Sequence, residues 1–356
     1  MSVFSHVPYG LMQGTMGTAM RVESNEHGYE QSNRFVRSHL VWDNQVCLAL
    51  NPFDEHFHSR LRRYRLSQVN IVVLNVGFGE HSIEEHIRAI AHFRHCSQER
   101  PDDYLLVANV ADIHKAVREQ KLGIIFNIEG ARAIGDQLSL IALYYSLGVR
   151  WMLMVYNRRN LVGGGCHDDE DLGLTKFGRA VLDEMARVGL IACCSHTGPR
   201  TTLDILAYSS KPVIFSHSNP RALWDHPRNI SDEAMLGCAA TGGVVCINGV
   251  GAFLGKNDTR TETIVRHIDY VVSLIGVEHV GIGLDHVFDR RQLKADIAKM
   301  TSSFPVGSGY DVILNFAGPE QIPEIAEMLL RSNYKEADVA MIVGANLLRV
   351  AEQVWQ

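Results

Sequence analysis

The chain has 356 residues, 46% of them hydrophobic, so it can bury a large core as one big α/β barrel or two smaller domains. Its net charge of −6 comes without a block of basic residues, which argues against a nucleic-acid-binding surface. No run approaches the ~18 apolar residues that span a membrane, and the seven cysteines are too scattered for a disulfide framework. These features predict a cytoplasmic protein whose partner is a small molecule, with no role for nucleic acid or a membrane.

Eight apolar runs predict β-strands, at residues 40–50, 69–76, 123–129, 149–155, 190–195, 212–216, 243–248 and 279–284. Segments of helical period separate them, at 82–96, 111–121, 136–147, 176–188, 200–209, 231–241 and 261–275, and further helices follow at about 319–331 and 335–351. Strands that are apolar throughout indicate burial on both faces, as in a parallel sheet. The pattern predicts an α/β fold: one (β/α)8 TIM-barrel domain over residues 37–356 with additional C-terminal helices. Residues 1–36 lack clear periodicity and are interpreted as an N-terminal arm or lid.

Side chains that bind metals or transfer protons lie at the ends of several predicted strands. Glu129 lies at the end of GIIFNIEG, His196 and His217 close GLIACCSH and KPVIFSH, and Asp285 closes HVGIGLD. The active site of a barrel forms at the C-terminal ends of its strands, so we expect these side chains to meet in one pocket. Imidazole and carboxylate ligands together suit zinc and similar divalent ions. We expect a metal on the two histidines and Glu129, a water activated by that metal, and Asp285 as the acid/base.

The first predicted strand carries unusual residues for such a site. Asp43, Gln45 and Cys47 lie at alternate positions and therefore share one face of the strand. A neutral amide is a poor replacement for imidazole, and a cysteine within an apolar strand is more often an inert core residue than a metal ligand. Gln45 and Cys47 are expected to line the pocket, and their coordination of the metal stays open.

Several motifs resemble the membrane (renal-type) dipeptidase family of the amidohydrolase superfamily, from about residue 38 onward. They are NIEG at 127–130, GLTKFGRAVLDEM at 173–185, VIFSHS at 213–218, HPRN at 226–229 and GIGLD at 281–285. The resemblance implies a (β/α)8 barrel with a two-zinc site, a homodimer, and hydrolysis of dipeptides. By position it also implies individual roles: a bridging carboxylate for Glu129, ligands of one metal for His196 and His217, the catalytic acid/base for Asp285, and binding of the substrate carboxylate for Arg228.

Three positions depart from the family pattern. The family's first-strand motif is Asp-x-His-x-Asp, whereas residues 43–47 read Asp-Asn-Gln-Val-Cys. The histidine expected after the fourth strand is Tyr156, and the aspartate expected three residues before the fifth strand's histidine is Cys193. Because two ligands of one zinc are lost, a single Zn²⁺ per chain is favoured. Tyr156 is then expected to orient the substrate carbonyl in catalysis and, with Asn157, to contact the substrate.

Together these features favour a metal-dependent hydrolase that cleaves a C–N (amide) bond of a small carboxylate-bearing substrate, such as a dipeptide or a modified amino acid. Two alternatives stay open: a lyase-type reaction with the metal as Lewis acid, and a non-catalytic binding protein on a dipeptidase scaffold. The coherent set of retained site residues argues against simple decay of the site. The altered first strand argues against ordinary dipeptidase activity.

Overall fold

The computed structural model describes residues 34–51, 54–305, 307, 310 and 313–356. Most of the predicted N-terminal arm, residues 1–33, lies outside the described residues. Phe35 and Val36 belong to the hydrophobic core, with exposed fractions of 3% and 1%. The folded part of the chain therefore extends into the range that the sequence assigns to the arm.

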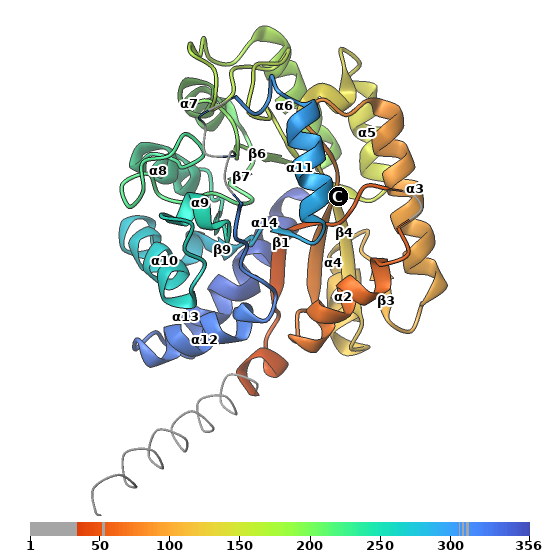
Figure 1. The fold of residues 1–356 in the computed structure, drawn as a ribbon, viewed down its shortest axis with the longest axis vertical. Coiled ribbons are helices and arrows are strands. Elements are labelled where there is room, and N and C mark those ends of the chain that lie inside the picture. Colours follow the sequence, from red (N-terminus) through yellow and green to blue (C-terminus); the bar gives the residue numbers. More distant parts are fainter. Residues whose placement is uncertain (1–33, 52–53, 306, 308–309, 311–312) are drawn as a thin grey trace, which may run out of the picture.

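Eight parallel strands surround the centre of the described structure (Figure 1). They are β1 (Trp42–Cys47), β2 (Ile71–Phe78), β4 (Leu122–Glu129), β5 (Val149–Leu153), β6 (Ile191–Cys193), β7 (Val213–Ile214), β8 (Val245–Ile247) and β9 (Val280–Ile282). Two short strands add to this set: β3 (Tyr104–Leu106) pairs with β4, and β10 (His286–Val287) pairs with β1. Each predicted strand is present in the predicted order.

The strands close into a barrel. Hydrogen bonding connects β10, β1, β2, β4, β5, β6 and β7 in that order, and β8 pairs with β9. A parallel bridge between Phe215 and Val245 connects β7 to β8. Beyond β9, the backbone N–H of Asp285 donates to the carbonyl of Gln45 on β1 at 3.0 Å. The predicted (β/α)8 TIM barrel is confirmed.

Helices surround the barrel. The first, α2 (Phe57–Leu66), lies where no helix was predicted, and the next follow the predicted order: α3 (Ile83–Glu99), α4 (Val110–Arg118), α5 (Ser139–Ser146), α6 (Lys176–Val188), α7 (Pro199–Tyr208), α8 (Asp232–Ala240) and α10 (Thr261–Ile275). Their starts carry local signals: Ser82 and Glu85 form a capping box on α3, and Thr175 caps α6. Two further helices, α9 (Gly251–Leu254) and α11 (Arg290–Lys299), were not predicted.

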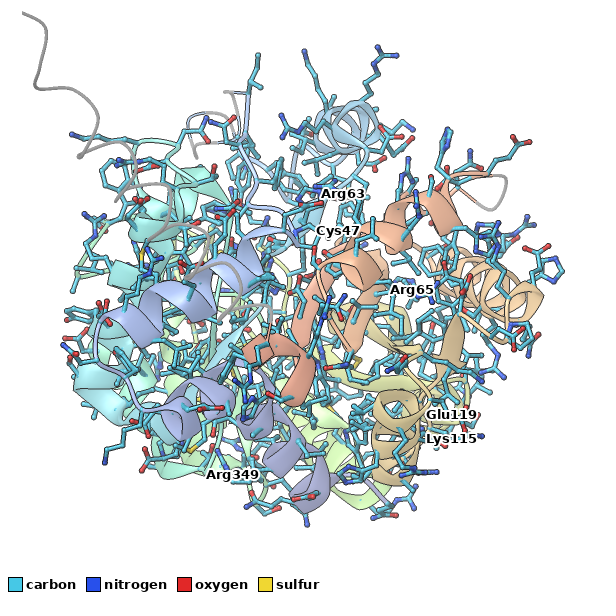
Figure 2. The ribbon with its side chains drawn as sticks, turned by 90° about the horizontal axis from the view of Figure 1, so that it is seen from below. Cys47, Arg63, Arg65, Lys115, Glu119 and Arg349 are labelled. Atoms are coloured by element: carbon cyan, nitrogen blue, oxygen red, sulfur yellow. The ribbon has the colours of Figure 1, made fainter. Side chains whose placement is uncertain are left out.

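The chain ends in α12 (Gln321–Arg331), α13 (Glu336–Ala340) and α14 (Asn346–Val354). The helix predicted over 335–351 is interrupted, because a π-helical turn at Met341–Ala345 separates α13 from α14. Leu347, Val350 and Val354 of α14 belong to the same buried cluster as Trp42 and Trp151, at the base of the barrel. In Figure 2, Arg349 on α14 and Cys47 at the end of β1 lie towards opposite ends of the molecule. None of the helices in the described residues is long and apolar enough to cross a membrane.

Candidate active site

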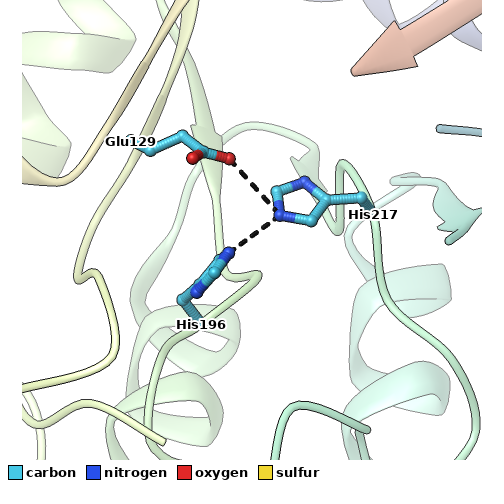
Figure 3. Close-up of side chains that lie close together, drawn as sticks. All are labelled: Glu129, His196 and His217. Carbon is cyan, nitrogen blue, oxygen red and sulfur yellow. Dashed lines mark hydrogen bonds and ion pairs between the residues drawn. The ribbon is translucent and has the colours of Figure 1, made fainter. Parts of the chain in front are cut away.

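Glu129, His196 and His217 lie together at the C-terminal ends of β4, β6 and β7 (Figure 3). The Nε2 atoms of the two histidines are 2.9 Å apart, and Glu129 Oε1 lies 3.3 Å from His217 Nε2. One ligand atom from each residue lies within 4.8 Å of the others, and all three residues are buried. The structure brings together the three residues that the sequence nominates as metal ligands.

The outer atoms of the two imidazole rings are held by hydrogen bonds. His196 Nδ1 lies 2.6 Å from Asn157 Oδ1, while Asn157 Nδ2 donates to the carbonyl of Ser303 at 2.9 Å. The amide oxygen is therefore an acceptor, so the ring's proton sits on Nδ1 and the lone pair of His196 Nε2 faces His217 and Glu129. His217 Nδ1 lies 2.7 Å from Ser216 Oγ, and this hydroxyl oxygen can accept a hydrogen bond from a protonated Nδ1 in the same way. Such outer partners fix the tautomer of metal-binding histidines.

Burial sets the protonation states of the cluster. It lowers the pKa of both His196 and His217 well below the usual value, and the positive charge of Arg228 lowers them further. Burial and the neighbouring Asp285 raise the pKa of Glu129 well above its usual value, which Arg228 partly offsets. A positive charge at the centre of the cluster would stabilise the ionised form of Glu129, and neutral imidazoles can donate their lone pairs to it. The cluster therefore has the ligand types that bind a divalent cation.

Three residues at the site have left-handed backbone conformations: Asn157 at φ 55°, His196 at φ 64° and Asp285 at φ 57°. Such conformations are uncommon for non-glycine residues and persist only where the surroundings hold them. The loop at 163–171 holds two of them, because Cys166 N donates to His196 O and His167 N donates to Asn157 O, each at 2.9 Å. The loop is packed tightly, since a Cβ at Gly165 would lie 2.2 Å from the Asn157 carbonyl oxygen.

Asp285 follows β9 and faces the same cleft as Glu129 and His196. Its Oδ2 accepts from Asn248 Nδ2 at 3.1 Å, and its Oδ1 accepts from the Cys47 thiol at 3.4 Å. Burial raises the pKa of Asp285, and Arg228 partly offsets that rise. The carboxyl group can therefore exchange a proton closer to neutral pH than an exposed aspartate can.

The first strand supplies neutral groups to the site. Gln45 Nε2 donates to Glu129 Oε1 at 2.8 Å, and Gln45 Oε1 accepts from Asn127 Nδ2 at 3.0 Å. Burial, followed by Asp285 and Glu129, raises the pKa of the Cys47 thiol well above its usual value, which disfavours the thiolate form that metals bind. Asp43 is also buried, and its Oδ1 accepts from the Leu284 N–H at 2.9 Å. The amide of Gln45 thus bonds the same Glu129 oxygen that lies 3.3 Å from His217 Nε2.

Arg228 lies beside the histidines with only 2% of its surface exposed. Its Nη2 donates to the carbonyl of His217 at 3.3 Å, and its guanidinium lies 5.2 Å from the centre of the Phe253 ring. Its Nε and Nη1 have no hydrogen-bond partner among the described residues. Buried donors without partners are costly, so this pair of N–H groups is suited to an anion such as a carboxylate.

Tyr156 follows β5 and stacks on His196, with ring centroids 4.2 Å apart and an interplanar angle of 22°. Burial raises the pKa of its phenol well above the usual value, and the negative charge of Glu129 adds to that rise. The hydroxyl therefore keeps its proton and can donate it in a hydrogen bond. Tyr156 and Cys47 line the same cleft as Glu129 and His196. Glu129, His196 and His217 are called the metal-type cluster below.

Some contributors to the site were missed or assigned differently from sequence. Asn248 and Asn127 were not singled out, although both are polar residues at or near the ends of apolar strands, which was the available signal. Asn157 was expected to contact substrate, whereas its side chain bonds His196 and the Ser303 carbonyl. The helix α11 lines the cleft as well, and its sequence gave no strong apolar period.

Comparisons with known proteins identify the family and the fold of the chain. The family model described as membrane dipeptidase (peptidase family M19) matches residues 55–299. Dipeptidase verJ of Clonostachys rogersoniana is 29% identical over 263 residues, which are 73% of this chain and 63% of that protein, so the chain spans less than two thirds of that relative's length. An amidohydrolase from Pseudomonas aeruginosa superposes with a TM-score of 0.82 at 27% identity, over 91% of this chain and 99% of the other. The probable dipeptidase PvdM of the same organism shares the fold, with a TM-score of 0.76 at 19% identity over 92% and 98% of the two chains.

Proposed function

Because the chain belongs to the membrane dipeptidase family, peptidase family M19, we propose that it is a metal-dependent hydrolase of small carboxylate-bearing amides. The bond cleaved is the C–N bond of a dipeptide or of a similarly modified amino acid. The observation that carries the proposal is the buried cluster of Glu129, His196 and His217, whose ligand atoms converge within 4.8 Å. The name of the relative dipeptidase verJ supports the choice of a dipeptide-like substrate.

The donor atoms fit a divalent ion such as Zn²⁺. Both imidazoles are neutral and direct Nε2 towards the centre of the cluster, and Glu129 supplies a carboxylate oxygen. His196, His217 and Glu129 would hold the ion. When bound, the ion supplies Lewis acidity, which polarises the scissile carbonyl and activates water near neutral pH.

One ion per chain is the stoichiometry that the site supports best. A second ion would need ligands from β1, where Gln45 is neutral and the Cys47 thiol is held in its protonated form. Gln45 Nε2 donates a hydrogen bond to Glu129 Oε1, the same oxygen that lies 3.3 Å from His217 Nε2, so a neutral amide stands on the β1 side of Glu129 where a second ion would need a ligand. The site therefore departs from the two-zinc pattern that the family resemblance implies.

The residues around the ion site divide the remaining work. Arg228 binds the substrate carboxylate through the N–H groups that have no partner in the described residues. Tyr156 donates its phenolic proton in a hydrogen bond to the substrate carbonyl, next to His196 on which it stacks. Asp285, held by Asn248, takes a proton from the attacking water and delivers it to the leaving nitrogen. Asn157 orients His196 from behind.

A direct test compares a dipeptide with its C-terminal amide, using zinc-loaded protein and the same protein after removal of the metal by chelation. We expect hydrolysis of the dipeptide, at least about tenfold weaker hydrolysis of the amide because Arg228 loses its anionic partner, and recovery by added zinc after chelation. Full activity in metal-free protein, or no hydrolysis of any dipeptide by zinc-loaded protein, contradicts the proposal. The homodimer and the cytoplasmic location stay predictions, which light scattering and cell fractionation check.

A further inference from the structure

One helix lies across the mouth of the cleft and turns a single face towards it. Residues from its cap and along one stripe line the cleft: Asp289, Gln292, Leu293, Asp296 and Ile297. These positions follow the spacing of one helix face, and the outer positions, including Ala295 and Ala298, are exposed. None of the residues of α11 is buried. The two large apolar side chains of this helix, Leu293 and Ile297, therefore border the cleft and are only partly buried.

A row of aromatic rings also lines the cleft. Neighbouring ring centroids lie 5.6 Å apart for Phe78 and Tyr156, 6.0 Å for Tyr156 and Phe304, and 4.9 Å for Phe304 and Tyr310. Phe253 continues the row at 6.2 Å from Tyr310 and lies under the guanidinium of Arg228. The row therefore runs from the carboxylate-binding arginine, past the metal-type cluster, to Phe78.

The barrel order places the two ends of this row across the mouth from each other. Arg228 lies in the segment after β7, and Phe78 ends β2. In the closed order of eight strands, β2 and β7 are four strands apart in either direction, because β4, β5 and β6 separate them on one side and β8, β9 and β1 on the other. A substrate whose carboxylate meets Arg228 and whose amide lies at the cluster must extend its acyl part towards Phe78.

The cleft that Phe78 lines has no lysine or arginine among its described lining residues, and the pKa of His81, whose ring lies 4.7 Å from that of Phe78, is lowered by burial. Leu48, Ala49 and Leu50, which follow β1, line the same cleft, together with Ile297 of α11. The cleft is partly open to solvent. Its charged lining residues among the described positions are acidic, Glu129, Asp285, Asp289 and Asp296, apart from the neutral His196. An apolar group gains from burial there, and an acidic group meets repulsion.

We propose that the physiological substrate carries a bulky, uncharged, apolar group on the acyl side of the scissile bond, seated between Phe78 and Ile297. This inference rests on the proposed hydrolase function, and it names the substrate class of the same site. Small dipeptides leave the space unfilled, and acyl residues with acidic side chains meet the carboxyl groups of Asp289 and Asp296 on the α11 side of the cleft. Phe78 and Ile297 determine specificity through contact and leave the chemistry to the cluster.

The experiment measures kcat/KM for Phe-Gly, Leu-Gly, Ala-Gly and Glu-Gly with zinc-loaded protein. We expect Phe-Gly and Leu-Gly to exceed Ala-Gly by at least about tenfold, which is the usual effect of filling an apolar pocket, and Glu-Gly to be the poorest. In Ile297→Asn, the ratio of Phe-Gly to Ala-Gly falls by about tenfold. The matched control, Ala298→Asn on the exposed face of the same helix, keeps the wild-type ratio.

A second measurement separates this inference from the proposed function. Calorimetry with the Asp285→Asn variant records binding of the same dipeptides without turnover, and we expect Phe-Gly to bind at least about tenfold more tightly than Ala-Gly. Hydrolysis with no preference for Phe-Gly and Leu-Gly overturns the substrate class and leaves the hydrolase function standing. Tighter binding of Phe-Gly, with no hydrolysis of any dipeptide by the wild type, overturns the hydrolase function and sustains the apolar acyl site.

Discussion

The two sides of the barrel mouth use different chemistry, although both are built in the same way from residues at strand ends. On the side of β4, β6 and β7, a carboxylate and two imidazoles converge, and the outer ring atoms are held by Asn157 and Ser216. On the side of β1, an amide and a protonated thiol take the corresponding place and bond to Glu129 and Asp285. The first side can hold a cation and the second can only position carboxylates. We therefore propose that this barrel keeps the metal ligands of one side of its mouth and lacks those of the other.

Loss of a ligand on the metal-binding side is expected to have the largest effect. In His217→Ala the bound ion is lost and hydrolysis falls by several orders of magnitude, because one of three converging ligands is removed. Elemental analysis and activity assays check this. The control is His114→Ala, an exposed histidine on α4, which should keep both properties. A fully active, metal-loaded His217→Ala would contradict the assignment of the cluster.

Asp285→Asn tests whether the carboxyl group beside β1 carries the proton while the other side carries the metal. We expect kcat to fall roughly 10²–10⁴-fold, the usual contribution of general acid–base catalysis, with the metal content unchanged. Steady-state kinetics and elemental analysis give the two values. Asp102→Asn, at an exposed position, is the matched control. Unchanged kcat in Asp285→Asn would remove the proton-transfer role.

Asn157 tests the hydrogen bond behind the metal-binding side. Asn157→Gly removes the acceptor of His196 Nδ1 without disturbing the left-handed backbone, so zinc affinity should fall about 10–100-fold. Competition with a chelator of known affinity measures this change. Asn157→Asp retains an oxygen acceptor and should stay much closer to the wild type. Equal zinc affinity in the two variants would show that the bond does not orient the ring.

Two buried histidines outside the site are expected to have a smaller effect, on the free energy of unfolding rather than on catalysis. His86 and His267 each bond a backbone carbonyl, and burial lowers the pKa of each to about 4. As the pH falls below about 6.5, the unfolded chain takes up protons that the folded protein does not bind until about pH 4. The free energy of unfolding should therefore fall by up to about 1.4 kcal/mol per pH unit per histidine across that window.

Urea unfolding at pH 7.5, 6 and 5 measures this loss of stability. The variant His267→Gln cannot titrate at that position, so its stability should decrease less steeply with falling pH than that of the wild type. Because His267 bonds the Leu254 carbonyl and lies outside the metal-type cluster, the variant should keep its metal at pH 7.5. An identical pH dependence in both proteins would contradict the neutral state of His267.

Most of the fold was predictable because the strands are buried on both faces. Runs such as 69–76 and 123–129 are apolar along their whole length, which distinguishes them from the amphipathic helices between them. The helix α11 escaped prediction for the opposite reason. Its apolar residues Leu293 and Ile297 border a cleft instead of the core, so too few of them recur to give a helical period. The π-helical turn at Met341–Ala345 has no separate sequence signal that we identify.

The candidate site was predictable to the extent that it depends on strand ends. Glu129, His196 and His217 each follow an apolar run, and a closed barrel brings such positions together. The bonds of Asn157 and Asn248 were not predictable, because an amide has no sequence signature that identifies its partner. The neutral state of Cys47 also depends on tertiary structure, since burial and two nearby carboxyl groups set it.

The number of zinc ions per chain, measured in the wild type and in the variant Gln45→His/Cys47→Asp after removal of excess metal, tests the single-metal site most directly. We expect one ion in the wild type, held by the side with the two histidines, and a second ion in the variant, whose β1 side gains an imidazole and a carboxylate. Two ions in the wild type would contradict the single-metal site, because Gln45 and Cys47 would then be ligands. No ion in the wild type would contradict the metal site itself.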